Sequence, residues 1–127
     1  MSETPDPAVV ELAHQLFDFA RHGETDKLAV YLDAGAPVEL TGPDGNTLLM
    51  LAAYNGQPDT VAELIARGAD VDKLNDRGQS PLAGAIFHGE EPVVALLLGA
   101  GADPDLGTPS ARATAEMFGH TDLLKDL

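Results

Sequence analysis

A spacing of 33 residues between similar features constrains this chain more than anything else in its sequence. Apolar positions return at this interval, so that Val61 and Leu64 have equivalents in Val94 and Leu97. The glycines follow it in three series: Gly23, Gly56 and Gly89; Gly35, Gly68 and Gly101; and Gly45 and Gly78. A period of this length is typical of stacked copies of one supersecondary unit, because a single copy cannot bury its own apolar face. The sequence therefore predicts a linear pile of repeats.

Each repeat carries signals for two helices followed by an extended segment. In the second repeat, Thr47 is placed as the N-cap of a first helix, and Ala52 is small enough to let a neighbouring helix approach closely. Pro58 suits the first turn of a second helix, where its missing N–H costs nothing. Residues 69–78 alternate weakly and end in a turn signal, which predicts a hairpin-like finger leading to the next N-cap, Ser80.

The first and last repeats differ from this pattern. A stripe of apolar residues at spacings of three and four predicts a longer first helix, from residue 8 to about residue 21: Val9, Leu12, Ala13, Leu16, Phe19 and Ala20. Thr25 is expected to be the N-cap of the helix that follows. The interval from Gly89 to Gly119 is 30 residues, so the last finger lacks three residues. Gly84 falls inside a predicted helix, where it costs roughly 1 kcal/mol relative to alanine.

Composition limits the kind of protein this can be. The chain has 127 residues, enough for one domain, and its 44% hydrophobic and 22% charged residues are ordinary for a globular protein. A net charge of −14 repels nucleic acid and anionic lipid and favours a basic protein partner; alternatively, it only keeps the protein soluble. The absence of cysteine excludes disulfides and thiolate metal sites. No leader peptide or membrane-length apolar run is found, so we expect a cytoplasmic protein.

The repeated unit resembles that of the ankyrin repeat family. The residues that carry the resemblance are Gly45–Ala53 (GNTLLMLAA), Gly78–Ala85 (GQSPLAGA) and the Gly-Ala-Asp runs at 68–70 and 101–103. The resemblance implies an all-α repeat solenoid of about four helix-turn-helix repeats with β-hairpin-like fingers and a concave face. It also implies a protein-binding module without catalytic chemistry, similar to small free-standing ankyrin proteins of bacteria. The expected organisation is a flexible lead-in over residues 1–7 and a repeat domain over residues 8–127, with repeats at 8–40, 41–73, 74–106 and 107–127.

Motifs of enzymes and metal sites are missing from the sequence. It has no glycine-rich phosphate loop, no Gly-x-Ser-x-Gly elbow and no His-Glu-x-x-His motif. His22 and His88 lie two repeats apart, too far for one metal ion, and the resemblance implies a structural role for His120. We therefore expect no catalytic residue, no cofactor and no metal. Two pairs of aspartates are expected to be solvated finger residues rather than cation ligands: Asp70 with Asp72, and Asp103 with Asp105.

Side chains next to the glycine between the two helices of a repeat are the candidates for partner binding. By register, the two residues before that glycine lie on the concave side: Tyr54 and Asn55, Phe87 and His88, and Met117 and Phe118. Their apolar groups are either anchors of an interface or ordinary core between successive helices. Finger residues would supply a polar rim around them: Asp44, Asn46, Asp76, Arg77 and Gln79.

These features lead to two main hypotheses of function, and a third, an enzyme or metal protein, has no motif in its support. In the first, the protein is a monomeric, non-enzymatic adaptor or inhibitor that binds another protein through its concave face and finger tips, and its acidic flanks speed the capture of a basic surface. In the second, it is an acidic decoy that blocks the nucleic-acid groove of a DNA- or RNA-binding protein. Because of the negative charge, direct binding to nucleic acid or to a membrane is not expected.

Overall fold

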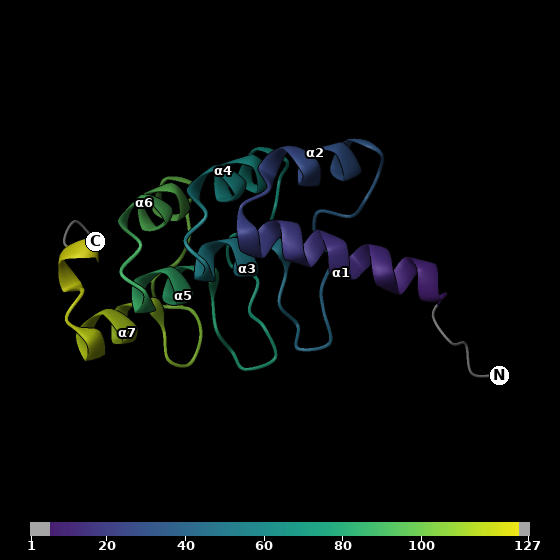
Figure 1. The fold of residues 1–127 in the computed structure, drawn as a ribbon. Coiled ribbons are helices and arrows are strands. Elements are labelled where there is room, and N and C mark those ends of the chain that lie inside the picture. The colour runs from purple at the N-terminus through teal and green to yellow at the C-terminus, as the bar shows by residue number, and fades with distance from the viewer. Residues whose placement is uncertain (1–5, 125–127) are drawn as a thin grey trace.

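Helix pairs stacked side by side build the protein, as the computed structural model shows for residues 6–124 (Figure 1). The first helices of the pairs contact one another in one row, and the second helices contact one another in a second row. This is the all-α repeat solenoid that the sequence predicts. The elements are α1 (Pro7–His22), α2 (Thr25–Asp33), α3 (Leu48–Tyr54), α4 (Pro58–Ala66), α5 (Pro81–Phe87), α6 (Glu91–Gly99), α7 (Ala111–Phe118) and the 3-10 helix η1 (Thr121–Leu124).

The fingers project from the first row of helices (Figure 1). Between residues 6 and 124 they are loops rather than paired strands, with isolated bridges between Thr41 and Thr47 and between Gly107 and Ser110. The surface formed by the first-row helices and the fingers is the one that the resemblance implies to be concave. Residues 1–5 of the expected lead-in and the last three residues of the expected fourth repeat lie outside the described part of the chain.

The same local chemistry starts each short first-row helix. The side chains of Thr47, Ser80 and Ser110 accept hydrogen bonds from the main-chain N–H three residues further on, at 3.0, 3.0 and 3.1 Å. These bonds satisfy N–H groups that have no partner within the helix. Thr47 and Ser80 are therefore N-caps as predicted. Ser110 follows Ser80 by 30 residues, in agreement with the shortened last finger.

The prediction that Thr25 caps the second helix is wrong. Thr25 is the first residue of α2, and the N-cap position belongs to Glu24, whose side chain makes no capping bond. The hydroxyl of Thr25 instead lies 2.7 Å from that of Thr60, which is completely buried in α4. A buried hydroxyl requires a hydrogen-bond partner, and Thr25 provides it from the neighbouring repeat.

The core is a continuous layer between the two rows of helices. The equivalent residues Val61, Leu64, Val94 and Leu97 of the second row are each at most 2% exposed. Small residues of the first row complete the layer, since Ala52 is also fully buried and lets the rows pack closely. The 33-residue apolar pattern therefore marks the buried face of the second and third repeats.

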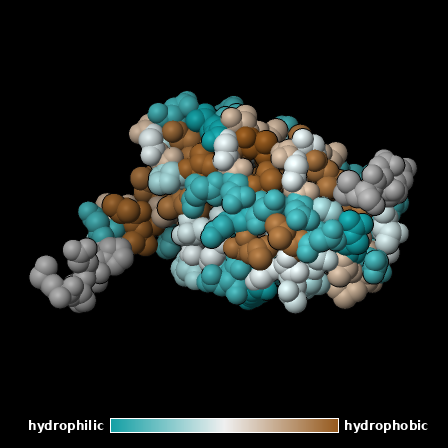
Figure 2. Space-filling view, turned by 180° about the vertical axis from the view of Figure 1, so that it is seen from behind, coloured by the Kyte–Doolittle hydropathy of each residue, from teal (hydrophilic) through white to brown (hydrophobic). Residues whose placement is uncertain are grey.

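The apolar stripe of α1 is buried only in its second half. Leu16 and Ala20 belong to the core, but Val9 and Leu12 are 62% and 38% exposed. The reason is length: α1 has 16 residues whereas α3 and α5 have seven each, so the first turns of α1 extend past the neighbouring helix (Figure 1). Apolar surface on this projecting end is visible at the left of Figure 2.

Side chains that follow the glycines between paired helices connect successive repeats. Gln57 lies over Gly23 of the preceding repeat and donates a hydrogen bond from Nε2 to the carbonyl oxygen of Arg21 at 2.9 Å. His120 likewise packs over Gly89, where an added Cβ would lie 3.2 Å from its Cε1 atom. A side chain on Gly23 would collide with Gln57, and the positive φ of +71° at this turn already favours glycine. His120 therefore packs against the preceding repeat, and the structural role that the resemblance implies for it stays a prediction.

Candidate functional site

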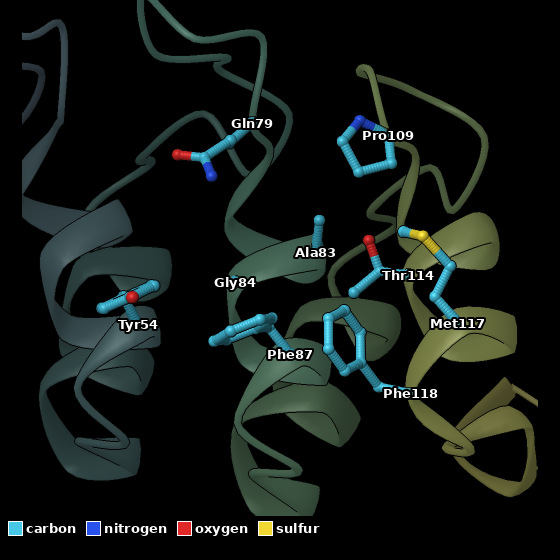
Figure 3. A pocket seen from close by; sticks show the side chains of 9 residues that line it. All are labelled: Tyr54, Gln79, Ala83, Gly84, Phe87, Pro109, Thr114, Met117 and Phe118. Carbon is cyan, nitrogen blue, oxygen red and sulfur yellow. The ribbon is translucent and has the colours of Figure 1, made fainter.

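A groove with a volume of about 290 Å³ lies where the fingers meet α3, α5 and α7 (Figure 3). Large apolar side chains form its rim and stay well exposed: Tyr54 by 41%, Phe87 by 44%, Met117 by 60% and Phe118 by 49%. These side chains come from three successive repeats, and each lies in the last two residues of a first-row helix. The groove therefore runs across the repeats rather than along one of them.

The rings at the rim contact one another without being buried. Tyr54 and Phe87 are nearly parallel, with ring centroids 6.5 Å apart and an angle of 9° between the rings. Phe87 and Phe118 meet edge to face, with centroids 4.8 Å apart at 78°. Both arrangements are favourable for aromatic pairs. Since these rings remain 41–49% exposed, they are not the ordinary interhelical core that the sequence left open as an alternative.

Small residues form the floor of the groove. Ala83 and Gly84 of α5 are buried beneath the rim, and a Cβ added to Gly84 would lie 3.3 Å from both Tyr54 Cδ2 and Met50 Cε. The sequence shows Gly84 only as an unfavourable helix residue. In the structure its missing side chain makes room for Tyr54 and deepens the groove. A glycine inside a predicted helix is the signal that points to such close packing.

The finger side of the groove is held by side-chain amides. Asn46 Nδ2 donates to Asp44 Oδ2, and Asn75 Nδ2 lies 2.8 Å from both Asn46 Oδ1 and Gln79 Oε1. The main-chain N–H of Asp76 also donates to the carbonyl oxygen of Asp44 at 3.1 Å. Three of the predicted rim residues, Asp44, Asn46 and Gln79, are thus brought together, and only Gln79 among the predicted finger residues lines the groove.

Several contributors to the site escape prediction from the sequence. Asn75, which is only 9% exposed, connects two fingers, yet its equivalent one repeat earlier is Gly42, so the periodicity gives no signal for it. Pro109 and Thr114 line the groove from the last repeat. Pro109 lies next to the shortened finger, whose Thr108 donates a main-chain hydrogen bond to the carbonyl oxygen of Gly78 at 3.0 Å.

Four other predicted residues lie beside the groove rather than in it. His88 meets both Tyr54 and Phe87 edge to face, with ring centroids 4.5 and 5.0 Å away. The side chain of Asn55 turns back on its own helix, where Nδ2 donates to the carbonyl oxygen of Leu51 at 2.8 Å. The other two are exposed at the finger tips: Asp76 and Arg77.

The acidic surface is only partly neutralised by ion pairs. The described residues include six of the seven Lys and Arg residues, and four of these six pair with carboxylates: Arg21, Lys27, Arg67 and Arg112. Hydrogen bonds from Arg112 lower the pKa of Asp105. The pKa of Arg67 is raised by its hydrogen bonds to Glu63 and then to Asp33. Most carboxylates in the described residues have no cationic partner, so the excess negative charge faces solvent.

The aspartate pairs support turns of the fingers. Asp70 Oδ1 and Asp103 Oδ1 each accept a hydrogen bond, at 2.9 Å, from the main-chain N–H two residues further on. Asp72 Oδ1 accepts another from the main-chain N–H of Asp103 in the next repeat, also at 2.9 Å. Within residues 6–124, no group of three or more His, Cys, Asp or Glu side chains is placed to hold a metal ion. Over the same range, no helix combines the length and apolar character needed to cross a bilayer.

Stacked helix pairs with loops projecting from one row define a solenoid repeat protein. Residues 16–108 match the family model described as Ankyrin repeats (3 copies), and the chain belongs to the ankyrin repeat family. It is also similar to an ankyrin repeat protein of Pseudomonas aeruginosa, with 41% identity over 59 residues that make up 43% of this chain. The match spans 34% of the length of that relative. Ankyrin repeats are generally protein–protein interaction modules.

Proposed function

We propose that this protein is a non-enzymatic adaptor or inhibitor that binds another protein through its concave face and finger tips. The observation that carries the proposal is the gathering of four large apolar side chains, each 41–60% exposed, around one groove: Tyr54, Phe87, Met117 and Phe118. Keeping such groups in water is unfavourable, and a partner that covers them regains that free energy. Buried aromatic anchors of this kind commonly dominate the affinity of an interface.

The charge of the protein supports a partner with a basic surface. The formal net charge is −14, and most carboxylates of the described residues have no ion-pair partner. Complementary charge chiefly raises the association rate, whereas the groove would supply most of the affinity. A monomeric state and a cytoplasmic location complete the proposal and stay predictions.

The test compares two changes that remove exposed apolar side chains at different places. A partner is isolated with the wild-type protein, identified by mass spectrometry and then titrated against purified variants by calorimetry. The double variant Tyr54→Ala/Phe87→Ala should weaken binding at least about 30-fold, since anchor residues contribute about 2 kcal/mol or more. Val30→Ala is the matched control because Val30 is 64% exposed on α2, outside the groove. Unchanged binding by a folded double variant would remove the groove from the proposal.

The alternative function, an acidic decoy for a nucleic-acid-binding protein, is favoured by the charge alone. A decoy that replaces a phosphate backbone should lose affinity steeply as salt rises and should compete with an oligonucleotide for its partner. Binding that depends on the groove should change far less with salt, because apolar burial is not screened. Titration of the isolated partner at low and high salt separates the two functions.

A further inference from the structure

Asn75 determines how the side chain of Gln79 is oriented at the groove. Asn75 is only 9% exposed, and its Oδ1 atom accepts hydrogen bonds from the main-chain N–H groups of Arg77 and Gln79, both at 3.0 Å. A main-chain N–H can only donate, so the oxygen of the Asn75 amide is identified by chemistry. The amide nitrogen of Asn75 therefore lies on the other side of the group.

That nitrogen in turn identifies the two ends of the Gln79 amide. Asn75 Nδ2 lies 2.8 Å from Gln79 Oε1, and the atom that it meets has to be an acceptor. Gln79 Nε2 consequently points toward the groove (Figure 3), and no residue between 6 and 124 accepts a hydrogen bond from it. The second contact of Asn75 Nδ2 agrees with its being a donor, because this nitrogen also lies 2.8 Å from Asn46 Oδ1. The finger amides thus present one unpaired donor to the groove.

The size and lining of the groove restrict what can occupy it. Its volume of about 290 Å³ is at the lower limit of the roughly 300–1,000 Å³ of pockets for small-molecule ligands, so it suits one large side chain. No Asp, Glu, Lys, Arg or His residue lines it. An apolar occupant that covered Gln79 without accepting its hydrogen bond would bury an unpaired N–H, which is unfavourable. The occupant therefore needs an acceptor beside its apolar part.

The charge of the protein selects among acceptors. A carboxylate would approach a molecule with a net charge of −14, and Asp44 and Asp76 are exposed on the fingers beside Gln79. Repulsion disfavours such an anion, whereas a neutral carbonyl meets no such penalty. The same two aspartates favour Lys or Arg in the segments of a partner that flank the groove. A peptide segment supplies all three features, since every residue carries a main-chain carbonyl.

We infer that the groove binds a peptide segment of the partner that inserts one Leu, Met, Phe or Trp side chain between Phe87 and Met117. A main-chain carbonyl next to that side chain accepts a hydrogen bond from Gln79 Nε2, and Lys or Arg residues flank it. The inference rests on the proposed function, because it specifies the chemistry of the partner at the same groove.

The experiment uses a phage-displayed library of random linear peptides selected on the 127-residue chain. Enriched peptides should share one large apolar residue with Lys or Arg nearby, and they are then synthesised and titrated by calorimetry. Gln79→Glu keeps an acceptor for Asn75 but replaces the donor at the groove by a carboxylate oxygen, so it should weaken binding about tenfold or more. Gln79→Met, which removes the donor without adding charge, should weaken binding about tenfold. Gln15→Met is the matched control because Gln15 is exposed on α1.

Each outcome of these titrations decides a separate point. If Phe87→Ala abolishes binding while both Gln79 variants bind like the wild type, the groove keeps its proposed function and the carbonyl contact is refuted. Tighter binding by Gln79→Glu would show that the peptide group contacting residue 79 is a donor rather than a carbonyl acceptor, which also overturns the inference. Enriched peptides without a shared apolar residue, or no enriched peptide at all, would overturn the insertion of a single side chain. Binding unaffected by Phe87→Ala would refute the groove as the binding site.

Discussion

Ile86 and Phe87 are neighbours in α5 whose truncation should affect stability very differently. Ile86 is completely buried in the core, whereas Phe87 is 44% exposed at the rim of the groove. Both residues are large and apolar and lie at the end of the same helix, so replacing either by alanine changes helix propensity by similar amounts. The comparison therefore separates burial from the other effects of the substitution.

The expected magnitudes follow from burial and from the ring contacts. Burying a whole Phe side chain contributes about 1.5–3 kcal/mol, and little more than half of Phe87 is covered, so the transfer contribution is about 1 kcal/mol. The edge-to-face contact with Phe118 adds roughly 0.5–1.5 kcal/mol, which brings Phe87→Ala to about 2 kcal/mol. Ile86→Ala leaves a closed cavity as well and should cost about 3.5 kcal/mol, within the 2–5 kcal/mol range for such changes.

Urea unfolding followed by circular dichroism measures both free energies of unfolding. Ile86→Val serves as a calibration and should cost about 0.5–1.5 kcal/mol. If Phe87→Ala destabilises the protein as much as Ile86→Ala, the ring of Phe87 belongs to the core. Phe87 would then not belong to an exposed rim of the groove.

Two further predictions concern a finger turn and an ion pair. Gly45→Ala and Gly68→Ala both place a side chain on a residue with positive φ. At Gly45 the added Cβ lies 2.8 Å from the main-chain nitrogen of Asp76 in the next finger, whereas at Gly68 it meets nothing within 4 Å. In parallel urea titrations, Gly45→Ala should therefore lower the free energy of unfolding more than Gly68→Ala does, by at least about 1 kcal/mol. Hydrogen bonding to Arg112 lowers the pKa of Asp105 from 3.8, so this contact stabilises the fold above about pH 4 and is lost as the pH falls through the folded-state pKa. Urea midpoints of the wild type and Asp105→Asn should differ at pH 7 and converge toward pH 3, and a constant difference would contradict the assignment.

The sequence alone predicts the repeat architecture because its signals are local. Thr47 and Ser80 reach main-chain groups only three residues away, so their capping bonds follow from the order of residues. The buried series that includes Leu64 and Leu97 is likewise visible as a 33-residue period. The same register places Tyr54, Phe87, Met117 and Phe118 on one face, although their role in binding a partner stays a prediction.

Contacts between repeats could not be predicted from such local sequence signals. Thr25 pairs with Thr60 across two repeats instead of capping its own helix, and the exposed start of α1 depends on how short α3 is. The expected hairpin-like fingers lack paired strands between residues 6 and 124, and side-chain contacts such as that of Asn75 with Asn46 link one finger to the next.

Sequence by itself determined the number of helix pairs, their order and the buried face of each, because these depend on interactions within one turn or one repeat. Only the tertiary structure decided that Gly84 opens a groove beneath Tyr54 and that Asn75 turns the donor of Gln79 into it. The physical reason is that a groove is a volume enclosed by side chains from separate repeats. Its depth and its hydrogen-bonding groups depend on distances between those repeats, which a linear pattern of residues does not contain.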